Sequence, residues 1–280
     1  MKKDDFRKIQ PGFQLSLNNY TTAGYCWDIL TQSRFADPLF LERYGYKAYS
    51  QNDEDGIIAE IFRRIGTTDK RFIEFGVQNG LESNTHYLLF KDWQGLWIEG
   101  SSEFYTEIQN KFRSVINSGQ LAVQNEFITR ENINKIFHEN GFHGEIDLLS
   151  IDIDGNDYHV WKAVDVVSPR VVVIEYNAKF PPDCDWHMPY REHHVWDGTD
   201  RFSASLKALE RLGGEKGYQL VGTNISGVNA FFVRRDLAGK EFSHPPTAEN
   251  LYNPCRYGEI RFVSGHPPGI CVKNLTQDVK

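Results

Sequence analysis

The sequence predicts an α/β fold in which a mostly parallel, seven-stranded sheet is flanked by helices. Short apolar segments with strand character alternate with helix-length segments through the middle of the chain, as is typical of parallel sheets. The segment 171–174 is apolar without alternation, which indicates a strand covered on both faces. Only the turn 224–229 separates the last two strand segments, too few residues for a crossover helix. These two strands are therefore expected to pair antiparallel at one edge.

The expected elements follow in a regular order. Apolar residues at 57, 58, 61, 62 and 65, after the acidic run 53–55, predict an amphipathic helix that ends near Gly66. Apolar runs of strand length predict strands over 72–75, 95–98, 121–123, 146–151, 171–174, 218–221 and 230–233. The segments between the first six strands predict helices over 84–93, 103–117, 131–140, 157–166 and 202–212.

These elements place one α/β domain at residues 51–235. An N-terminal cap, residues 1–50, is rich in aromatic residues and turn formers. A C-terminal extension, residues 236–280, carries two Pro-Pro pairs, which favours a tail that wraps the domain over further regular structure.

Composition and charge disfavour several classes of protein. The 280 residues include 38 acidic and 31 basic ones, a net charge of −7, whereas nucleic-acid binding favours a basic face. No apolar run approaches the roughly 20 residues of a membrane span, and the first residues lack the apolar core of a signal peptide. The cysteines are far apart, as is typical of a reducing cytoplasm, at positions 26, 184, 255 and 271. We expect a cytoplasmic protein with a small-molecule substrate, and neither a nucleic-acid partner nor a membrane span; homo-oligomer formation is left open.

The first candidate ligand-binding motif is a strand that delivers Glu74 into a glycine-containing turn. Gly76 and Gly80 follow it, and glycine lets the backbone approach a ligand closely at the carboxyl edge of a sheet. The dinucleotide fingerprint G-x-G-x-x-G is absent because Gln78 occupies the place of its second glycine. The motif favours a loop under a smaller charged cofactor, and a plain strand-to-helix turn is the alternative.

A second acid, Glu99, ends the next predicted strand. An acid at this place accepts hydrogen bonds from a ribose diol in nucleotide-binding folds. The alternative is an ordinary surface glutamate. Together, the two motifs predict a nucleoside-type cofactor.

Oxygen ligands follow the fourth and fifth predicted strands. Asp152 and Asp154 come after the fourth, and Glu175 and Asn177 come at the end of the fifth. Because neighbouring parallel strands end at one edge, these side chains are expected within reach of one another, and they suit a hard divalent ion such as Mg²⁺ or Mn²⁺. Such an ion lowers the pKa of a substrate hydroxyl. The alternative is that 154–157 forms only a helix N-cap with an acidic first turn.

A long loop without regular periodicity follows the fifth strand, over residues 180–196. Loops of this length are usually functional, and this one carries three candidate general bases, His187, His193 and His194. Packing or solvated histidines are the alternative, and the adjacent pair cannot both point the same way. Trp186, Tyr190 and Trp196 suit stacking on a sugar ring.

Taken in order, these segments resemble the S-adenosylmethionine-dependent methyltransferases, and more narrowly the FkbM-like group. The resemblance covers about residues 50–235 and lies in 50–56, 72–76 with 79–80, 97–100, 151–157, 217–221 and 227–233. It implies a Rossmann-like, seven-stranded mixed sheet of the class I methyltransferase type, with six parallel strands and one reversed.

The resemblance also implies S-adenosylmethionine as the cofactor and a place for each cofactor-binding residue. Glu74 and Gly76 are expected by the methionine end, Gly80 at the turn into the helix, and Glu99 at the ribose. The remaining candidates are Asn125 by the adenine, Gln51 and Glu54 closing over the cofactor, and Asp152 facing it. The sequence departs from the familiar pattern because a third glycine between 76 and 80 is missing.

The acids at the fourth and fifth strands are similar to the metal sites of catechol and macrocin O-methyltransferases. The leading hypothesis is therefore an O-methyltransferase that acts on a hydroxyl of a saccharide or a glycosylated small molecule. Asp152, Asp154 and Glu175 would hold the hydroxyl through an ion, or His193 or His194 would deprotonate it.

Three alternatives remain. A metal-dependent hydrolase would use Asp152, Asp154, Glu175 and His193 around a metal-bound water, but it leaves Glu99 without a purpose. A non-catalytic nucleoside-binding module would bind the cofactor without turnover. A nicotinamide oxidoreductase is disfavoured by the missing glycine fingerprint.

Overall fold

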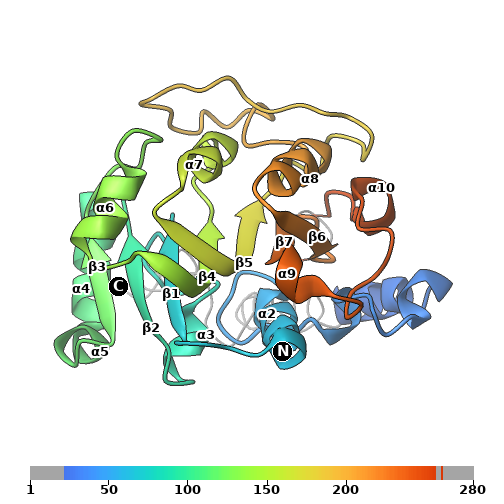
Figure 1. The fold of residues 1–280 in the computed structure, drawn as a ribbon, viewed down its shortest axis with the longest axis horizontal. Coiled ribbons are helices and arrows are strands. Elements are labelled where there is room, and N and C mark those ends of the chain that lie inside the picture. The colour runs from blue at the N-terminus through green and yellow to red at the C-terminus, as the bar shows by residue number, and fades with distance from the viewer. Residues whose placement is uncertain (1–21, 257–259, 261–280) are drawn as a thin grey trace, which may run out of the picture.

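The computed structural model describes residues 22–256 and residue 260. Seven strands form one sheet in the order β3-β2-β1-β4-β5-β7-β6 (Figure 1). Neighbours pair in parallel except β7, which is antiparallel to both β5 and β6. This confirms the predicted fold, including the reversed strand of the class I methyltransferase type. The strands are β1 (Arg71–Phe75), β2 (Gln94–Ile98), β3 (Leu121–Gln124), β4 (Gly144–Ile151), β5 (Val167–Glu175), β6 (Tyr218–Thr223) and β7 (Asn229–Arg234).

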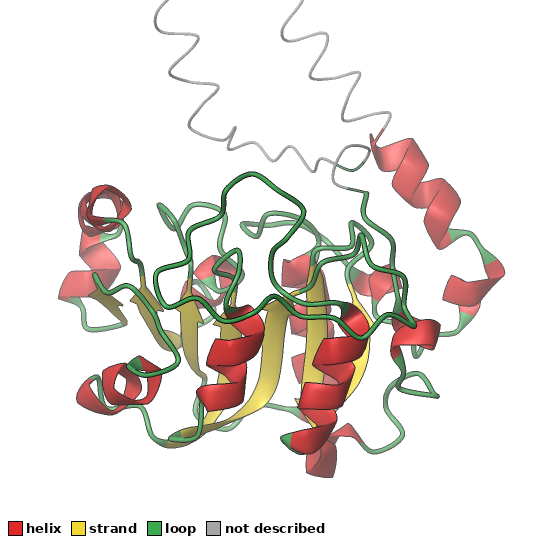
Figure 2. Ribbon diagram, turned by 90° about the horizontal axis from the view of Figure 1, so that it is seen from above, coloured by secondary structure: helices red, strands yellow, loops and turns green. Residues whose placement is uncertain are grey.

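Helices cover both faces of the sheet (Figure 2), and each face has its own hydrophobic core. One core joins the sheet to α6 (Ile133–Glu139), α7 (Asp157–Ala163) and α8 (Leu206–Glu215). The other joins it to α2 (Glu54–Ile65), α3 (His86–Leu89) and α4 (Ser102–Lys111). Val171–Ile174 of β5 is fully buried between them, as the unbroken apolar run predicts.

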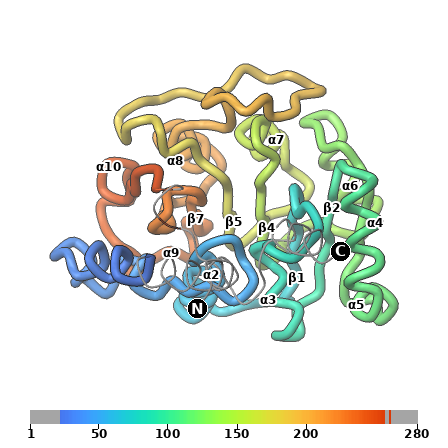
Figure 3. The backbone as a smooth tube through the Cα atoms, turned by 180° about the vertical axis from the view of Figure 1, so that it is seen from behind, coloured from blue at the N-terminus to red at the C-terminus, as the bar shows by residue number. Residues whose placement is uncertain are grey.

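Shorter elements complete the fold. They are η1 (Ser33–Ala36), η2 (Glu42–Tyr44), α5 (Arg113–Asn117), α9 (Arg235–Ala238) and α10 (Ala248–Leu251). Figures 1 and 3 both place the helical residues 22–30 at the edge of the domain that carries α9 and α10. No helix in the described ranges is long and apolar enough to cross a membrane.

Three predicted helices differ from the structure. The helix expected over 84–93 is only the four-residue α3, because the backbone N–H groups of Asn84 and Thr85 are held by Glu74 instead. The helix expected over 103–117 breaks at Phe112, whose ring packs 4.8 Å from that of Trp97. The helix expected over 202–212 begins only at Leu206, because residues 203–205 pair with the backbone of 186–188.

The limits of the cap and of the extension stay a prediction. In their described parts, the two segments meet: buried Asn253 donates to Glu42 of η2 at 2.8 Å. Residues 1–21 and most of 257–280, including Cys271, lie outside the described residues.

Candidate functional site

The turn after β1 is pressed against the turn after β4. Gly76 has a φ of 78°, in the region that favours glycine, and a Cβ there would overlap the carbonyl oxygen of Asp152. At Gly80, with a φ of 76°, a Cβ would overlap the ring of Trp97. Close approach of other parts of the protein therefore explains both glycines, and the expected approach of a ligand stays a prediction.

Glu74 holds the end of the segment that leads from the glycine loop into α3. It is 4% exposed and accepts hydrogen bonds from the backbone N–H groups of Asn84 (2.8 Å) and Thr85 (3.0 Å) and from the hydroxyls of Thr85 (2.5 Å) and Ser150 (3.2 Å). Burial nevertheless raises the pKa of this carboxyl. Glu74 therefore fixes the backbone just before α3, and its place by the methionine end of the cofactor stays a prediction.

Glu99 brings the ends of three segments together. One oxygen accepts from the N–H of Gln78 and the other from the N–H of Ser101, both at 2.8 Å. The amide of Asn125 donates to the Glu99 carbonyl at 2.8 Å. Burial raises the pKa of Glu99. The structure thus brings together Glu99, Asn125 and the glycine loop, as the sequence predicts.

Glu54 differs from expectation, whereas the closing of Gln51 over a cofactor stays a prediction. Gln51 is exposed. Glu54 is fully buried and accepts from the amides of Asn52 (3.2 Å), Asn224 (2.7 Å) and Asn229 (3.0 Å). It therefore ties the start of α2 to the β6–β7 turn, and this engaged carboxylate is not free to close over a cofactor.

The neighbouring acid, Asp53, gives a testable pH dependence. It is 3% exposed, and its Oδ1 has no hydrogen-bond partner among the described residues. Burial, and next the charge of Glu54, raise the pKa of Asp53 well above its usual range. The stability that goes with the neutral carboxyl is therefore present at low pH and lost as the pH rises through the folded-state pKa. As the pH rises above the ordinary aspartate pKa of about 3.9, the Tm of Asp53→Asn should fall less than the Tm of the wild type.

Calorimetry across these pH values tests the prediction, with Asp28→Asn, at an exposed position, as the matched control. Equal losses of Tm in Asp53→Asn and the wild type would contradict it.

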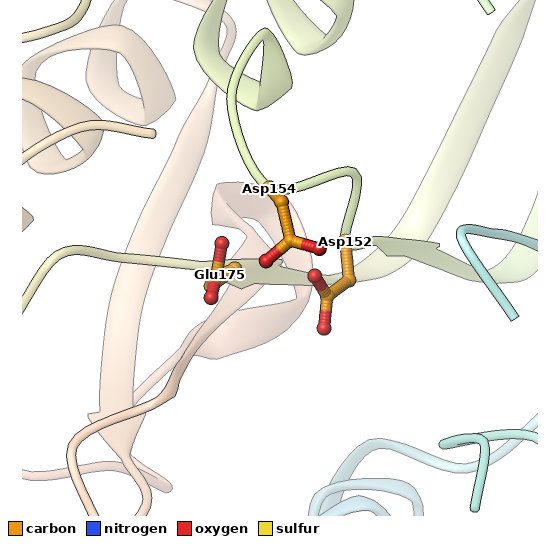
Figure 4. Close-up of side chains that lie close together, drawn as sticks. All are labelled: Asp152, Asp154 and Glu175. Carbon is orange, nitrogen blue, oxygen red and sulfur yellow. The ribbon is translucent and has the colours of Figure 1, made fainter. Parts of the chain in front are cut away.

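Three carboxylates converge at the ends of β4 and β5. Ligand atoms of Asp152, Asp154 and Glu175 all lie within 4.8 Å of one another, and the three side chains point toward a common centre (Figure 4). The pairing of Ile151 with Ile174 brings the two strand ends side by side. This group, the carboxylate cluster, confirms the predicted juxtaposition.

The electrostatics of the carboxylate cluster favour a cation. Burial first, and then the charge of Asp154, raise the pKa of Asp152; for Glu175, burial and then Asp152 act in the same direction. Glu175 is 8% exposed, and its Oε2 finds no hydrogen-bond partner in the part of the chain that the structure describes. An orphaned carboxylate oxygen within an all-oxygen donor set fits Mg²⁺ or Mn²⁺. The ion itself stays a prediction.

Asn177 does not belong to the carboxylate cluster, and its assignment as a ligand is corrected. Its amide nitrogen donates to the carbonyls of Asp200 (2.8 Å) and Phe202 (3.2 Å), and its amide oxygen accepts from the N–H of Lys179 at 3.2 Å. The side chain is fully buried. Asn177 therefore holds the return of the long loop toward α8.

The turn that carries Asp152 and Asp154 is held by Asp157. Its two oxygens accept from the backbone N–H groups of Ile153 and Gly155, each at 2.8 Å. Burial raises the pKa of Asp157 to about 6. Asn156 is the N-cap residue of α7, but its side chain makes no cap hydrogen bond. Helix capping therefore does not explain why an asparagine stands at this position.

The long loop between β5 and α8 arches over the domain (Figure 2). Its residues 186–196, here called the lid, are fixed on α7, where a ring nitrogen of His159 lies 2.7 Å from the Met188 carbonyl oxygen. His187 stacks on Tyr158 of α7 at 4.1 Å, and burial lowers the pKa of His187. These contacts pack the His187 ring against Tyr158 and His159 of α7, as the packing alternative expects.

His194 is the lid histidine that meets the carboxylate cluster. A Cβ at Gly155 would overlap its ring. Burial raises the pKa of Asp154, and the nearby His194 ring partly offsets that rise. Within the described ranges, its buried Nε2 has no hydrogen-bond partner. His193 is exposed and points instead toward Phe127, with ring centroids 6.4 Å apart.

Two of the residues expected to stack on a sugar ring contact other side chains of the protein instead. Trp186 stacks on Phe180 at 4.5 Å, and Tyr190 lies under the guanidinium of Arg130 at 3.9 Å. Trp196 is 52% exposed and stays accessible. The sequence analysis did not single out Phe127, a 43% exposed aromatic residue that lies between Glu99 and His193. Its position directly after Asn125 and Glu126, which were expected near the adenine, could have indicated it.

Known proteins resemble this chain in fold. No family model and no curated protein matches it. A magnesium protoporphyrin IX methyltransferase from Synechocystis PCC 6803, solved with bound S-adenosylmethionine, is 12% identical over 65% of this chain and 77% of its own, with a TM-score of 0.41. The N-terminal domain of EvdMO1, solved with S-adenosylhomocysteine and D-fucose, is 12% identical over 74% and 95%, with a TM-score of 0.43. An S-adenosylmethionine-dependent methyltransferase from Clostridium acetobutylicum is 12% identical over 75% and 98%, with a TM-score of 0.41.

Proposed function

We propose that the chain is an S-adenosylmethionine-dependent O-methyltransferase that acts on a hydroxyl of a saccharide or a glycosylated small molecule. The observation that carries the proposal is that Glu99 and the carboxylate cluster lie at the same edge of the sheet, joined where Gly76 contacts Asp152. Methyl transfer needs a donor and an acceptor in line, and two adjoining sites supply that arrangement.

On the donor side, Glu99 and Asn125 are the groups that would hold the adenosine. When bound, S-adenosylmethionine supplies a methyl group that its sulfonium charge has already activated. The surrounding acids create a negative potential, because Asp152 lies close enough to Asp154, Asp157 and Glu74 to feel their charges. Such a field favours a positively charged sulfonium over an uncharged thioether.

On the acceptor side, Asp152, Asp154 and Glu175 would hold a Mg²⁺ or Mn²⁺ ion. A divalent ion, when bound, lowers the pKa of a hydroxyl placed beside it. His194, whose Nε2 is unpaired among the described residues, is then the group that takes the hydroxyl proton. The exposed rings of Phe127 and Trp196 offer apolar faces to a sugar ring.

Binding of the cofactor tests the proposal directly. Titration calorimetry with S-adenosylmethionine should give saturable binding to the wild type, and Glu99→Gln should weaken it about 10- to 100-fold, because a charged acceptor for the ribose is lost. Glu103→Gln, at an exposed position on the following helix, is the matched control. Isotope-labelled cofactor with a panel of saccharides and glycosylated acceptors then tests the transfer.

A metal-dependent hydrolase is the second candidate, because the carboxylate cluster and His194 also suit activation of a water. It predicts turnover without S-adenosylmethionine and loss of turnover on chelation. Absence of cofactor binding by the wild type, together with metal-dependent hydrolysis, would favour it over methyl transfer.

A further inference from the structure

One asparagine joins the lid to the turn that carries the carboxylates. Asn156 is 3% exposed; its amide nitrogen donates to the Arg191 carbonyl at 2.7 Å, and its amide oxygen accepts from the Arg191 N–H at 3.3 Å. A carboxamide can hold both backbone groups of one residue because it carries a donor and an acceptor. Asn156 therefore fixes both the position and the direction of the backbone at Arg191.

Arg191 begins the turn that carries the two candidate bases. The N–H of His194 donates to the Arg191 carbonyl at 3.0 Å, so the oxygen that Asn156 holds also closes this turn. The placement of the His193 and His194 rings thus follows from the placement of Arg191.

The backbone turn that precedes Asn156 is also held in place. Asp157 holds the N–H groups of Ile153 and Gly155, so the turn leading from Asp152 cannot shift independently of α7. Gly155 supplies the bare backbone surface on which the His194 ring rests. Two features therefore place the His194 imidazole beside Asp154. One is the pair of hydrogen bonds between Asn156 and Arg191, and the other is the close approach of the ring to Gly155, which has no Cβ.

We infer that Asn156 is a positioning residue, which locks the lid turn so that His194 stands at the carboxylate cluster and the two segments act as one unit. The inference rests on the proposed function, because the place of His194 matters for catalysis only if the carboxylate cluster presents a hydroxyl. Asn156 acts through His194 and Arg191 and is not itself a catalytic residue.

Hydrogen–deuterium exchange of the full chain tests the clamp. Asn156→Ala removes both hydrogen bonds, and Asn156→Asp retains the acceptor but loses the donor. Amides of the lid should exchange about 10- to 100-fold faster in Asn156→Ala, since each lost bond shifts the opening equilibrium by roughly three- to tenfold. Asn134→Ala is the matched control, because that amide also joins two backbone segments, through Ala163 (2.8 Å) and Asp165 (3.0 Å), but not those of the lid.

Gly155→Ala provides an independent variant. Gly155 does not have a positive φ, so alanine is compatible with its backbone, but the new Cβ would displace the His194 ring while the Asn156 clamp stays intact. With Mn²⁺ as the probe, NMR of histidine-labelled protein should show broadening of the His194 signal in the wild type and in Asn134→Ala. The broadening should fall in both Asn156→Ala and Gly155→Ala, and His194→Gln assigns the signal.

The outcomes separate this inference from the proposed function. Lid exchange and His194 broadening unchanged in Asn156→Ala, with Mn²⁺ and S-adenosylmethionine still bound, would overturn the inference and leave the proposed function standing. A wild type that binds neither probe would overturn the proposed function. In that case the exchange rates of Asn156→Ala and Asn134→Ala still decide whether the clamp exists, and equal rates reject it.

Discussion

Replacing Asp152 by asparagine is expected to stabilise the protein in the absence of metal while it lowers methyl transfer about 10²- to 10⁴-fold. Burial and the neighbouring charge of Asp154 raise the pKa of Asp152, so the ionised side chain is disfavoured in the folded protein. Asparagine removes that charge at nearly constant volume. The same change removes a ligand from the carboxylate cluster, so stability and activity should move in opposite directions.

Thermal unfolding and transfer of labelled methyl groups measure the two effects in the same preparations. Mn²⁺ should raise the Tm of the wild type, because it binds only the folded cluster, and should raise that of Asp152→Asn much less. Asp92→Asn is the control, since Asp92 is exposed and precedes β2 at the opposite edge of the sheet. A variant that is less stable than the wild type without metal, or that keeps full activity, would contradict this account of the carboxylate cluster.

The sheet and the edge that bears the site could be predicted because they depend on local patterns. The short turn 224–229 fixes the pairing of β6 with β7, and the strand ends fix where Glu99, Asp152 and Glu175 must gather. Residues at or directly after a buried strand have little freedom of position. This is why the carboxylate cluster lies where the sequence places it.

Side-chain direction could not be predicted in the same way. Asn177 lies only two residues beyond Glu175, yet its amide turns toward Asp200 and Phe202. Glu54 carries the charge expected beside a cofactor, but three asparagine amides engage it. A sequence motif gives the place of a residue along an element, whereas its hydrogen-bond partners come from segments far away in the chain.

The lid shows the same limit more strongly. Its length and histidine content marked it as functional, but no periodicity indicates which histidine reaches the carboxylates. That choice depends on Asn156 and Gly155, which in the sequence are typical of an ordinary helix start. Their role follows only from the approach of Arg191 and His194.

The largest effect on stability is expected at Asp147, far from the candidate site. This side chain is fully buried in β4 and accepts hydrogen bonds from the N–H groups of Thr68 (3.0 Å), Asp69 (3.1 Å) and Lys70 (2.7 Å). The guanidinium of Arg170 lies 3.1 Å from its Oδ1. Asp147→Ala should lower the free energy of unfolding by about 3–5 kcal/mol, because three backbone donors lose their acceptor and a largely buried guanidinium loses its counter-charge.

Denaturant unfolding measures this loss, and Glu145→Ala is a demanding control. Glu145 lies two residues away on the same strand and pairs with the same Arg170 at 3.7 Å, but it is exposed. Its replacement should lower the free energy of unfolding by less than about 1 kcal/mol, since solvent screens the exposed Glu145 carboxylate even though Arg170 is largely buried. Similar losses of unfolding free energy in the two variants would mean that pairing with the charge of Arg170 contributes more to stability than the hydrogen bonds from the buried backbone donors. A loss of stability in Asp147→Ala several times that in Glu145→Ala would mean that the buried Asp147 carboxylate holds the turn before β1. It would then also hold the register of β1, the strand that presents Glu74.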